Sequence, residues 1–227
     1  MKGVANMNNT EKYYKKYCTM LTNAINNNYK VLNYKIDKNI WRNTRIAMGN
    51  CVENEIAKLV NSILKRRDYK YIIDAQLYYG EKNPIRPDIL VVDKDNIIRY
   101  MFEIKSQMGY CRDTELEDYK SNQDKLCKAK LIKYNRIQFE KGIEKDAIVP
   151  MNTRVKEELV CDKNIKTIFV NLMQSNGVSK ELKNINGVFY FSLFKKGIWY
   201  DSISYENINE DKKHGFKAFI DYISKLQ

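Results

Sequence analysis

Residues 86–105 read RPDILVVDKDNIIRYMFEIK, and this stretch decides the fold. Two runs of apolar, largely β-branched residues flank a cluster of polar turn formers at residues 93–96. That pattern is typical of a tight β-hairpin. A turn at the centre of the cluster predicts that Val92 pairs with Ile97.

Counting outward from the turn places Asp88 opposite Met101. Opposed residues share a face of a sheet and side chains alternate along each strand, so Met101, Glu103 and Lys105 should lie on the face that carries Asp88. The intervening apolar side chains point the other way, into a core. The hairpin therefore brings two carboxylates and one ammonium group together at one end.

Two carboxylates this close repel each other unless a positive charge neutralises them. A divalent cation can do so, and a site made of oxygen ligands suits Mg²⁺. Lys105 would then position or help to deprotonate a water molecule. The alternative is that the three charges form an ordinary solvated strand face.

These residues resemble a known nuclease signature. Pro87-Asp88, a gap of 14 residues and then Glu103-Ile104-Lys105 are similar to the PD-(D/E)xK motif. That superfamily includes most type II restriction endonucleases and the archaeal Holliday-junction resolvases.

A strongly amphipathic helix is expected upstream, over residues 45–67. Its stripe consists of Met48, Val52, Ile56, Leu59 and Ile63, with Val60 at the edge. Glu53 and Glu55 lie on opposite borders of that stripe, and either could lean toward a site at the sheet edge. The sequence of residues 49–56, GNCVENEI, resembles the opening of the resolvase first helix, which makes Glu53 the candidate and Glu55 the reserve.

The other expected elements alternate between helices and strands. They are helix 10–28, strand 69–79, helix 114–140, short strand 147–150, brief helix 152–160, strand 167–173, a hairpin of 187–194 with 197–202, and helix 211–226. The resemblance implies an α/β fold with a restriction-endonuclease-like αβββαβ core at about residues 45–173. In that fold a mixed central sheet is flanked by helices, and an extra C-terminal β-hairpin and helix follow. We expect residues 1–227 to form one domain, with 10–28 and 187–227 as additions.

Composition limits the classes of function. The net charge of +12 favours a polyanionic partner, which could be DNA, RNA or an anionic lipid. We expect no membrane span, because no run of about 18 apolar residues occurs. The 5 scattered cysteines favour a reducing cytoplasm and argue against a zinc site. The single histidine argues against a zinc site built from histidines and against a serine–histidine triad.

The resemblance implies a set of roles at the site. Asp88, Glu103 and the main-chain carbonyl of Ile104 would hold Mg²⁺, and Glu53, or Glu55 in its place, would bind a second ion or a metal-bound water. Lys105 would orient the attacking water, and cleavage would leave 5′-phosphate and 3′-hydroxyl ends. For DNA contacts we name Gln107, Lys120 and Lys128, although a solvated surface role fits them equally well.

The leading hypothesis is a type II restriction endonuclease that cuts double-stranded DNA as a homodimer in a prokaryotic cytoplasm. A cognate DNA methyltransferase would belong to the same system. The runner-up is a structure-specific nuclease of the Holliday-junction resolvase or repair type. A nucleic-acid-binding module that does not cleave, and cleavage of RNA, also stay open.

Overall fold

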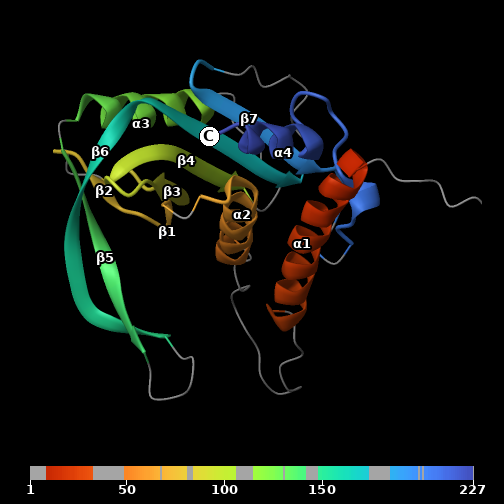
Figure 1. The fold of residues 1–227 in the computed structure, drawn as a ribbon, viewed down its shortest axis with the longest axis horizontal. Coiled ribbons are helices and arrows are strands. Elements are labelled where there is room, and N and C mark those ends of the chain that lie inside the picture. Colours follow the sequence, from red (N-terminus) through yellow and green to blue (C-terminus); the bar gives the residue numbers. More distant parts are fainter. Residues whose placement is uncertain are drawn as a thin grey trace, which may run out of the picture.

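The computed structural model describes residues 9–32, 49–66, 68–80, 84–105, 115–129, 131–141, 148–173, 185–198, 200 and 202–226. The helices are α1 (Asn9–Leu32), α2 (Gly49–Leu64), α3 (Glu115–Lys128), the short 3-10 helix η1 (Tyr205–Asn207) and α4 (Phe216–Ser224). The strands are β1 (Lys70–Ile73), β2 (Leu77–Tyr78), β3 (Ile89–Val92), β4 (Ile97–Lys105), β5 (Ile132–Lys141), β6 (Ile148–Met173) and β7 (Val188–Phe194). The fold is mixed α/β (Figure 1).

The predicted hairpin forms from β3 and β4, but its register differs from the prediction. Val92 pairs with Ile98 rather than with Ile97, and Arg99 is an extra residue between that pair and the next one. The bulge shifts the pairing by two positions at the far end of the hairpin. Asp88, which directly precedes β3, therefore falls beside Glu103 instead of Met101.

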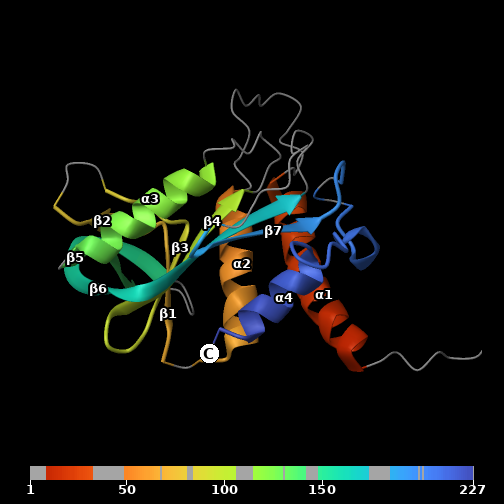
Figure 2. The same ribbon diagram turned by 90° about the horizontal axis from the view of Figure 1, so that it is seen from above.

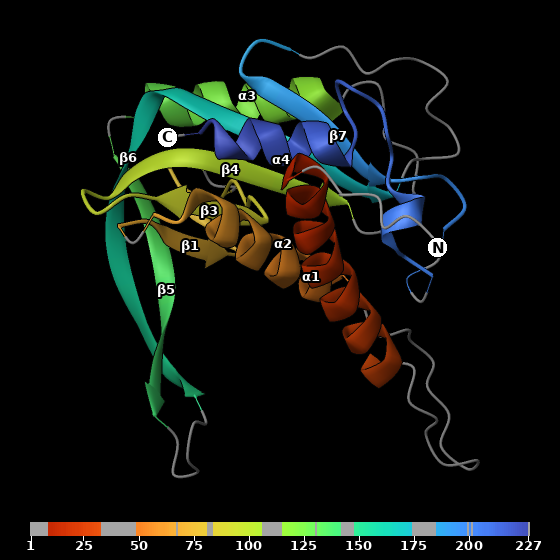
Figure 3. The ribbon, with the colours of Figure 1, turned by 45° about the vertical axis from the view of Figure 1, so that its right-hand side comes forward.

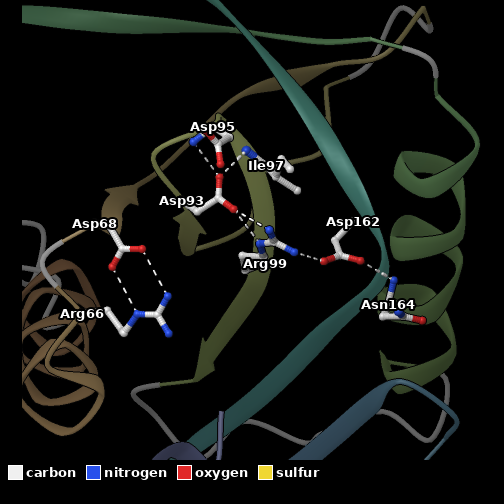
Figure 4. A network of polar contacts seen from close by, with 8 residues as sticks. All are labelled: Arg66, Asp68, Asp93, Asp95, Ile97, Arg99, Asp162 and Asn164. Atoms are coloured by element: carbon white, nitrogen blue, oxygen red, sulfur yellow. Dashed lines mark hydrogen bonds and ion pairs between the residues drawn. The ribbon is translucent and has the colours of Figure 1, made fainter. Parts of the chain in front are cut away.

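The turn chemistry explains the bulge. The Asp93 carboxylate accepts the backbone N–H groups of Asp95 and Ile97, at 2.9 and 3.0 Å, and so holds a wider turn than the predicted one. The Arg99 guanidinium donates to the same carboxylate and, across the sheet, to Asp162 of β6 (Figure 4). Arg99 is therefore not paired with a residue of β3, and its side chain forms ion pairs with two carboxylates.

The sheet has seven strands in the order β1-β3-β4-β6-β5-β2, and β7 also pairs with β6. β1 pairs antiparallel with β3, and β3 pairs antiparallel with β4. β4, β6 and β7 run parallel to one another. β6 is long enough to serve two partners. Its first part pairs with β5, and its last part lies between β4 and β7.

Helices cover both faces of the sheet (Figure 2). On one face, α1, α2 and α4 share a continuous core with inward residues of β3, β4, β6 and β7. On the other face, Leu126 and Leu116 of α3 contribute to two smaller clusters. The predicted α2 stripe is buried at every position from Val52 onward, and residues 167–173 are buried on both faces as predicted. Met48 lies outside the described residues.

Several predicted elements are wrong. The helix predicted over 114–140 ends at Lys128, and residues 132–140 belong to β5. The segment 152–160, predicted as a brief helix, is part of β6, and the strand predicted over 69–79 is split into β1 and β2. After β7, no second hairpin strand occurs among the described residues of 197–202, and Phe194 instead bridges to Ile208.

The predicted C-terminal helix is present as α4, and it buries Phe216, Phe219, Ile220 and Ile223 as expected. None of the helices in the described ranges combines the length and apolar character needed to cross a bilayer.

Candidate functional site

Asp88 lies where β3 has not yet begun to pair with β4. Its carboxylate Oδ2 accepts the backbone N–H of Ile104 at 2.5 Å and so continues the hydrogen bonding of the hairpin beyond the last paired residue. Its own carbonyl accepts the N–H of Asp74, at the end of β1, at 3.1 Å. These two contacts fix Asp88 at the edge where β1, β3 and β4 meet.

The residues around Ile104 take alternate faces of β4. Phe102 and Ile104 are in the core shared with α1, α2 and α4, whereas Met101 belongs to the cluster on the other face. Glu103 and Lys105 follow Met101 by alternation and share its face, as predicted from the sequence. A strand residue points its N–H and C=O to the same neighbour, so the Ile104 carbonyl is directed toward Asp88.

Charge and burial compete at Asp88. Burial raises the pKa of the Asp88 carboxyl above its ordinary value, while the hydrogen bond from Ile104 and the positive charge of Lys105 lower it. The net direction is upward, so the site disfavours the ionised form unless another positive charge is supplied.

Glu53 approaches from α2. Burial, together with the negative charges of Asp88 and Asp74, raises the pKa of Glu53 to about 7. Its Oε2 atom is buried and has no hydrogen-bond partner in the part of the chain that the structure describes. Glu55 behaves differently, because its buried carboxylate accepts the Lys58 ammonium at 2.8 Å. Of the two helix acids, Glu53 is therefore the one that interacts with Asp88.

Asp74 belongs to this carboxylate group, although the sequence analysis did not select it. Its charge acts on both Glu53 and Asp88. It follows the last residue of β1 with a φ of 55°, a left-handed conformation that aspartate tolerates better than most residues. An acid directly after a β-branched strand was the available signal.

Two further polar residues continue the row that begins at Lys105. Lys105 is in register with Asn171 of β6, and Asn171 is in register with Ser192 of β7. Asn171 and Ser192 are buried, with exposed fractions of 3% and 2%. Within the described residues, Asn171 Oδ1 and Ser192 Oγ have no hydrogen-bond partner. Buried unpaired polar atoms are rare in proteins, and these two lie near the carboxyl ends of parallel strands, where α/β sheets commonly bind ligands.

The donor chemistry at this edge suits Mg²⁺ only if water completes the coordination. No three His, Cys, Asp or Glu side chains in the described ranges lie close enough together to hold a metal ion by themselves. Mg²⁺ usually keeps several waters and needs only one or two protein carboxylates. Asp88 and Glu53 fit that requirement. The environment of Asp88 disfavours its ionised form, and Glu53 has a carboxylate oxygen without a hydrogen-bond partner among the described residues.

Two of the three residues predicted to contact DNA lie on α3. Gln107 is outside the described residues. Lys120 donates to Asp124 one turn along α3 at 2.6 Å, and Lys128 is exposed near the end of the same helix.

The site is thus an acidic and lysine-containing edge of a mixed α/β sheet. Comparison of the sequence with protein-family models and with curated proteins gives no match.

Proposed function

We propose that this protein is a Mg²⁺-dependent DNA endonuclease whose site consists of Asp88, Glu103, Lys105 and Glu53. The observation that carries the proposal is the position of the Asp88 carboxylate. This carboxylate accepts a hydrogen bond from the N–H of Ile104, the residue between Glu103 and Lys105. Its negative charge also acts on Glu53 of α2. The Asp88 carboxylate thus contacts the backbone of β4 and interacts electrostatically with α2.

The order of elements supports the nuclease proposal. From α2 onward the chain runs α2, β1, β3, β4, α3 and β6, with β4 parallel to β6. Apart from the short β2 and the added β5, this is the αβββαβ order that the PD-(D/E)xK resemblance implies. The restriction-endonuclease-like core is therefore part of this proposal.

The side chains have distinct tasks in the proposed reaction. Asp88, Glu103 and the Ile104 carbonyl would hold Mg²⁺, which when bound activates water and stabilises charge on the phosphate. Lys105 orients the attacking water and stabilises the developing negative charge. Glu53 accepts a hydrogen bond from a water in the same site, which would satisfy its unpartnered oxygen.

Within this class we propose a type II restriction enzyme that acts as a homodimer, with a cognate methyltransferase protecting the host DNA. A two-fold dimer is the simplest way for a chain of 227 residues to cut both strands. A structure-specific nuclease and a binding module that does not cleave are the alternatives. Cleavage of phage DNA, of branched junctions and of RNA by the same preparation separates these possibilities.

The decisive variants are Asp88→Ala and Lys105→Ala. Each should abolish cleavage in Mg²⁺ and leave DNA binding in Ca²⁺ largely intact, because the rest of the surface is unchanged. Sequencing the ends of a digested phage genome would reveal a recognition sequence. Cleavage by either variant at the wild-type rate would exclude the proposed site.

The helix acid is tested by a matched pair of variants. Glu53→Ala should reduce the cleavage rate more than Glu55→Ala, because only Glu53 interacts with Asp88. The reverse order would move the helix acid to Glu55.

A further inference from the structure

The solvent-facing side of α2 carries no acidic residue. Between Cys51 and Lys65 the exposed side chains are Asn54, Lys58, Asn61 and Lys65. The spacing of three or four residues places Asn54, Lys58 and Asn61 in one stripe along the helix, and Lys65 directly follows the last helical residue. Every other residue in this span is at least partly buried, so the stripe is the surface that α2 offers to a partner.

This stripe borders the free edge of the sheet. β1 is the terminal strand and pairs only with β3 among the described strands. Figure 3 shows α2 beside the β1–β3 end of the sheet. Two adjoining cavities of about 280 and 540 Å³ follow the junction and share Asn61 and Tyr71.

The lining of the two cavities is basic, amidic and aromatic. Its described residues are Asn54, Ala57, Lys58, Asn61, Lys65, Arg66, Tyr69, Tyr71 and Ile73. We call this surface the α2–β1 groove. No carboxylate lines it, although Arg66 pairs with the adjacent Asp68 and Lys58 pairs with Glu55. The Lys58 side chain is 69% exposed, so that pair is weak and Lys58 can also bind an anion.

The α2–β1 groove begins at the proposed active site. Asn54 directly follows Glu53, and Ile73 directly precedes Asp74, which acts on both Glu53 and Asp88. From Asn54 to Asn61 the stripe is about 10 Å long, from the helical rise of about 1.5 Å per residue, and Lys65 lies beyond its end.

We propose that the α2–β1 groove binds the phosphodiester backbone of the DNA strand on one side of the cleaved bond. This inference rests on the proposed nuclease function and adds the surface and direction of substrate binding. Lys58 and Lys65 contact phosphates, and the two asparagines donate to phosphate or sugar oxygens. A polyanion fits here because the lining residues combine positive charge with neutral hydrogen-bond donors.

The test measures binding separately from cleavage. Fluorescence anisotropy of the full chain with a labelled DNA duplex is recorded in EDTA over a range of salt concentrations. The variant Lys58→Gln/Lys65→Gln should bind about tenfold more weakly at about 0.1 M salt and lower the salt slope by about 2, because each phosphate contact contributes about one unit.

The control is Lys212→Gln/Lys213→Gln, which removes two exposed lysines in the loop before α4. It should change the affinity little. Equal losses in the two double variants, or wild-type binding by Lys58→Gln/Lys65→Gln, would overturn the proposal. So would the absence of duplex binding by the unmodified protein.

The outcome is independent of catalysis. DNA binding that depends on Lys58, without Mg²⁺-dependent cleavage, would support the proposed role of the α2–β1 groove and exclude the nuclease function. Cleavage with a salt slope that does not depend on Lys58 and Lys65 would keep the nuclease and reject the groove.

Discussion

At the residue scale, the two acids of α2 have opposite environments although only one residue separates them. Glu53 faces Asp88 and Asp74, whereas Glu55 is held by Lys58. Helical periodicity predicts that the two lie on opposite borders of the apolar stripe. It does not predict which border meets the sheet edge, because that depends on the packing of α2 against β1 and β4.

Replacing Glu53 by glutamine should stabilise the metal-free protein at alkaline pH. The pKa of Glu53 is raised from its ordinary value of 4.5 to about 7, so between these values the folded state binds more protons than the unfolded state. Stability therefore falls as the pH rises through this window. At about pH 8, Glu53→Gln should gain about 2 kcal/mol over the wild type after allowance for partial exposure, and at about pH 4 almost nothing.

Urea unfolding in EDTA at the two pH values measures this difference. Glu55→Gln is the matched control, and it should lack a gain at alkaline pH because it loses the ion pair with Lys58. An equal effect of Glu53→Gln at both pH values would show that the Glu53 carboxyl does not titrate as proposed.

Asn171 offers a second residue-scale prediction. Its Oδ1 atom is buried without a partner, which costs about 1–3 kcal/mol, and leucine has nearly the same shape. Asn171→Leu should therefore raise the free energy of unfolding by about 1 kcal/mol. If Asn171 serves the reaction, the same variant should also lose most Mg²⁺-dependent cleavage.

Unfolding and cleavage are measured on the same preparation of Asn171→Leu. A destabilised and fully active variant would contradict both parts of the expectation. Asn171 could not be selected from the sequence because its importance arises from pairing between strands that are distant in the chain.

At the element scale, the predictions succeeded where apolar periodicity was strong. The α2 stripe, the β3–β4 hairpin and the apolar run of 167–173 were recognised for that reason. Residues 132–140 were misread as helical because lysine, glutamine and glutamate are good helix formers. In the fold, pairing of β5 with β6 over ten residues overrides this weak preference.

The contact between α3 and β6 includes two thiols. Cys127 Sγ near the end of α3 lies 3.4 Å from Cys161 Sγ of β6. A mild oxidant such as diamide should join them, because each sulfur needs to move only slightly. Two thiol hydrogens pass to the oxidant and one S–S bond forms.

The disulfide would close a loop of 34 residues and stabilise the fold by up to about 4 kcal/mol. Thiol titration before and after oxidation should show a loss of two thiols, and the melting temperature should rise. Cys127→Ser is the control and should show no such rise. An unchanged thiol count in the wild type would place the two sulfurs too far apart to react.

At the scale of the whole molecule, the C-terminal segment is part of the main core. Buried residues of α4 share one cluster with α2 and with inward residues of β4. α2 also carries Glu53, so the packing of the C-terminal helix helps to position the proposed site. Nothing in the local pattern of residues 211–226 indicates this role, since an amphipathic helix packs on any apolar face.

The β5–β6 ribbon has the opposite relation to the core (Figure 1). The base of the ribbon is packed into the core, because Ile132, Tyr134 and Leu159 are buried. β2 also pairs with β5 there, at Lys133 and Tyr134. Beyond that point, residues 135–141 pair only with residues 148–156 among the described strands. We therefore expect the outer ribbon to contribute little to the stability of the sheet.

Replacing residues 136–155 by an Asn-Gly turn tests this expectation. The cut joins Asn135 to Lys156, which are direct partners across the ribbon, so a short hairpin can close there. The melting temperature should change by less than about 3 °C, which corresponds to about 1 kcal/mol for a domain of this size. A matched deletion of residues 132–159 should unfold the protein, because it removes the buried residues at the base. If the shorter deletion also unfolds the protein, the outer ribbon must pack against the body or against a second copy of the chain.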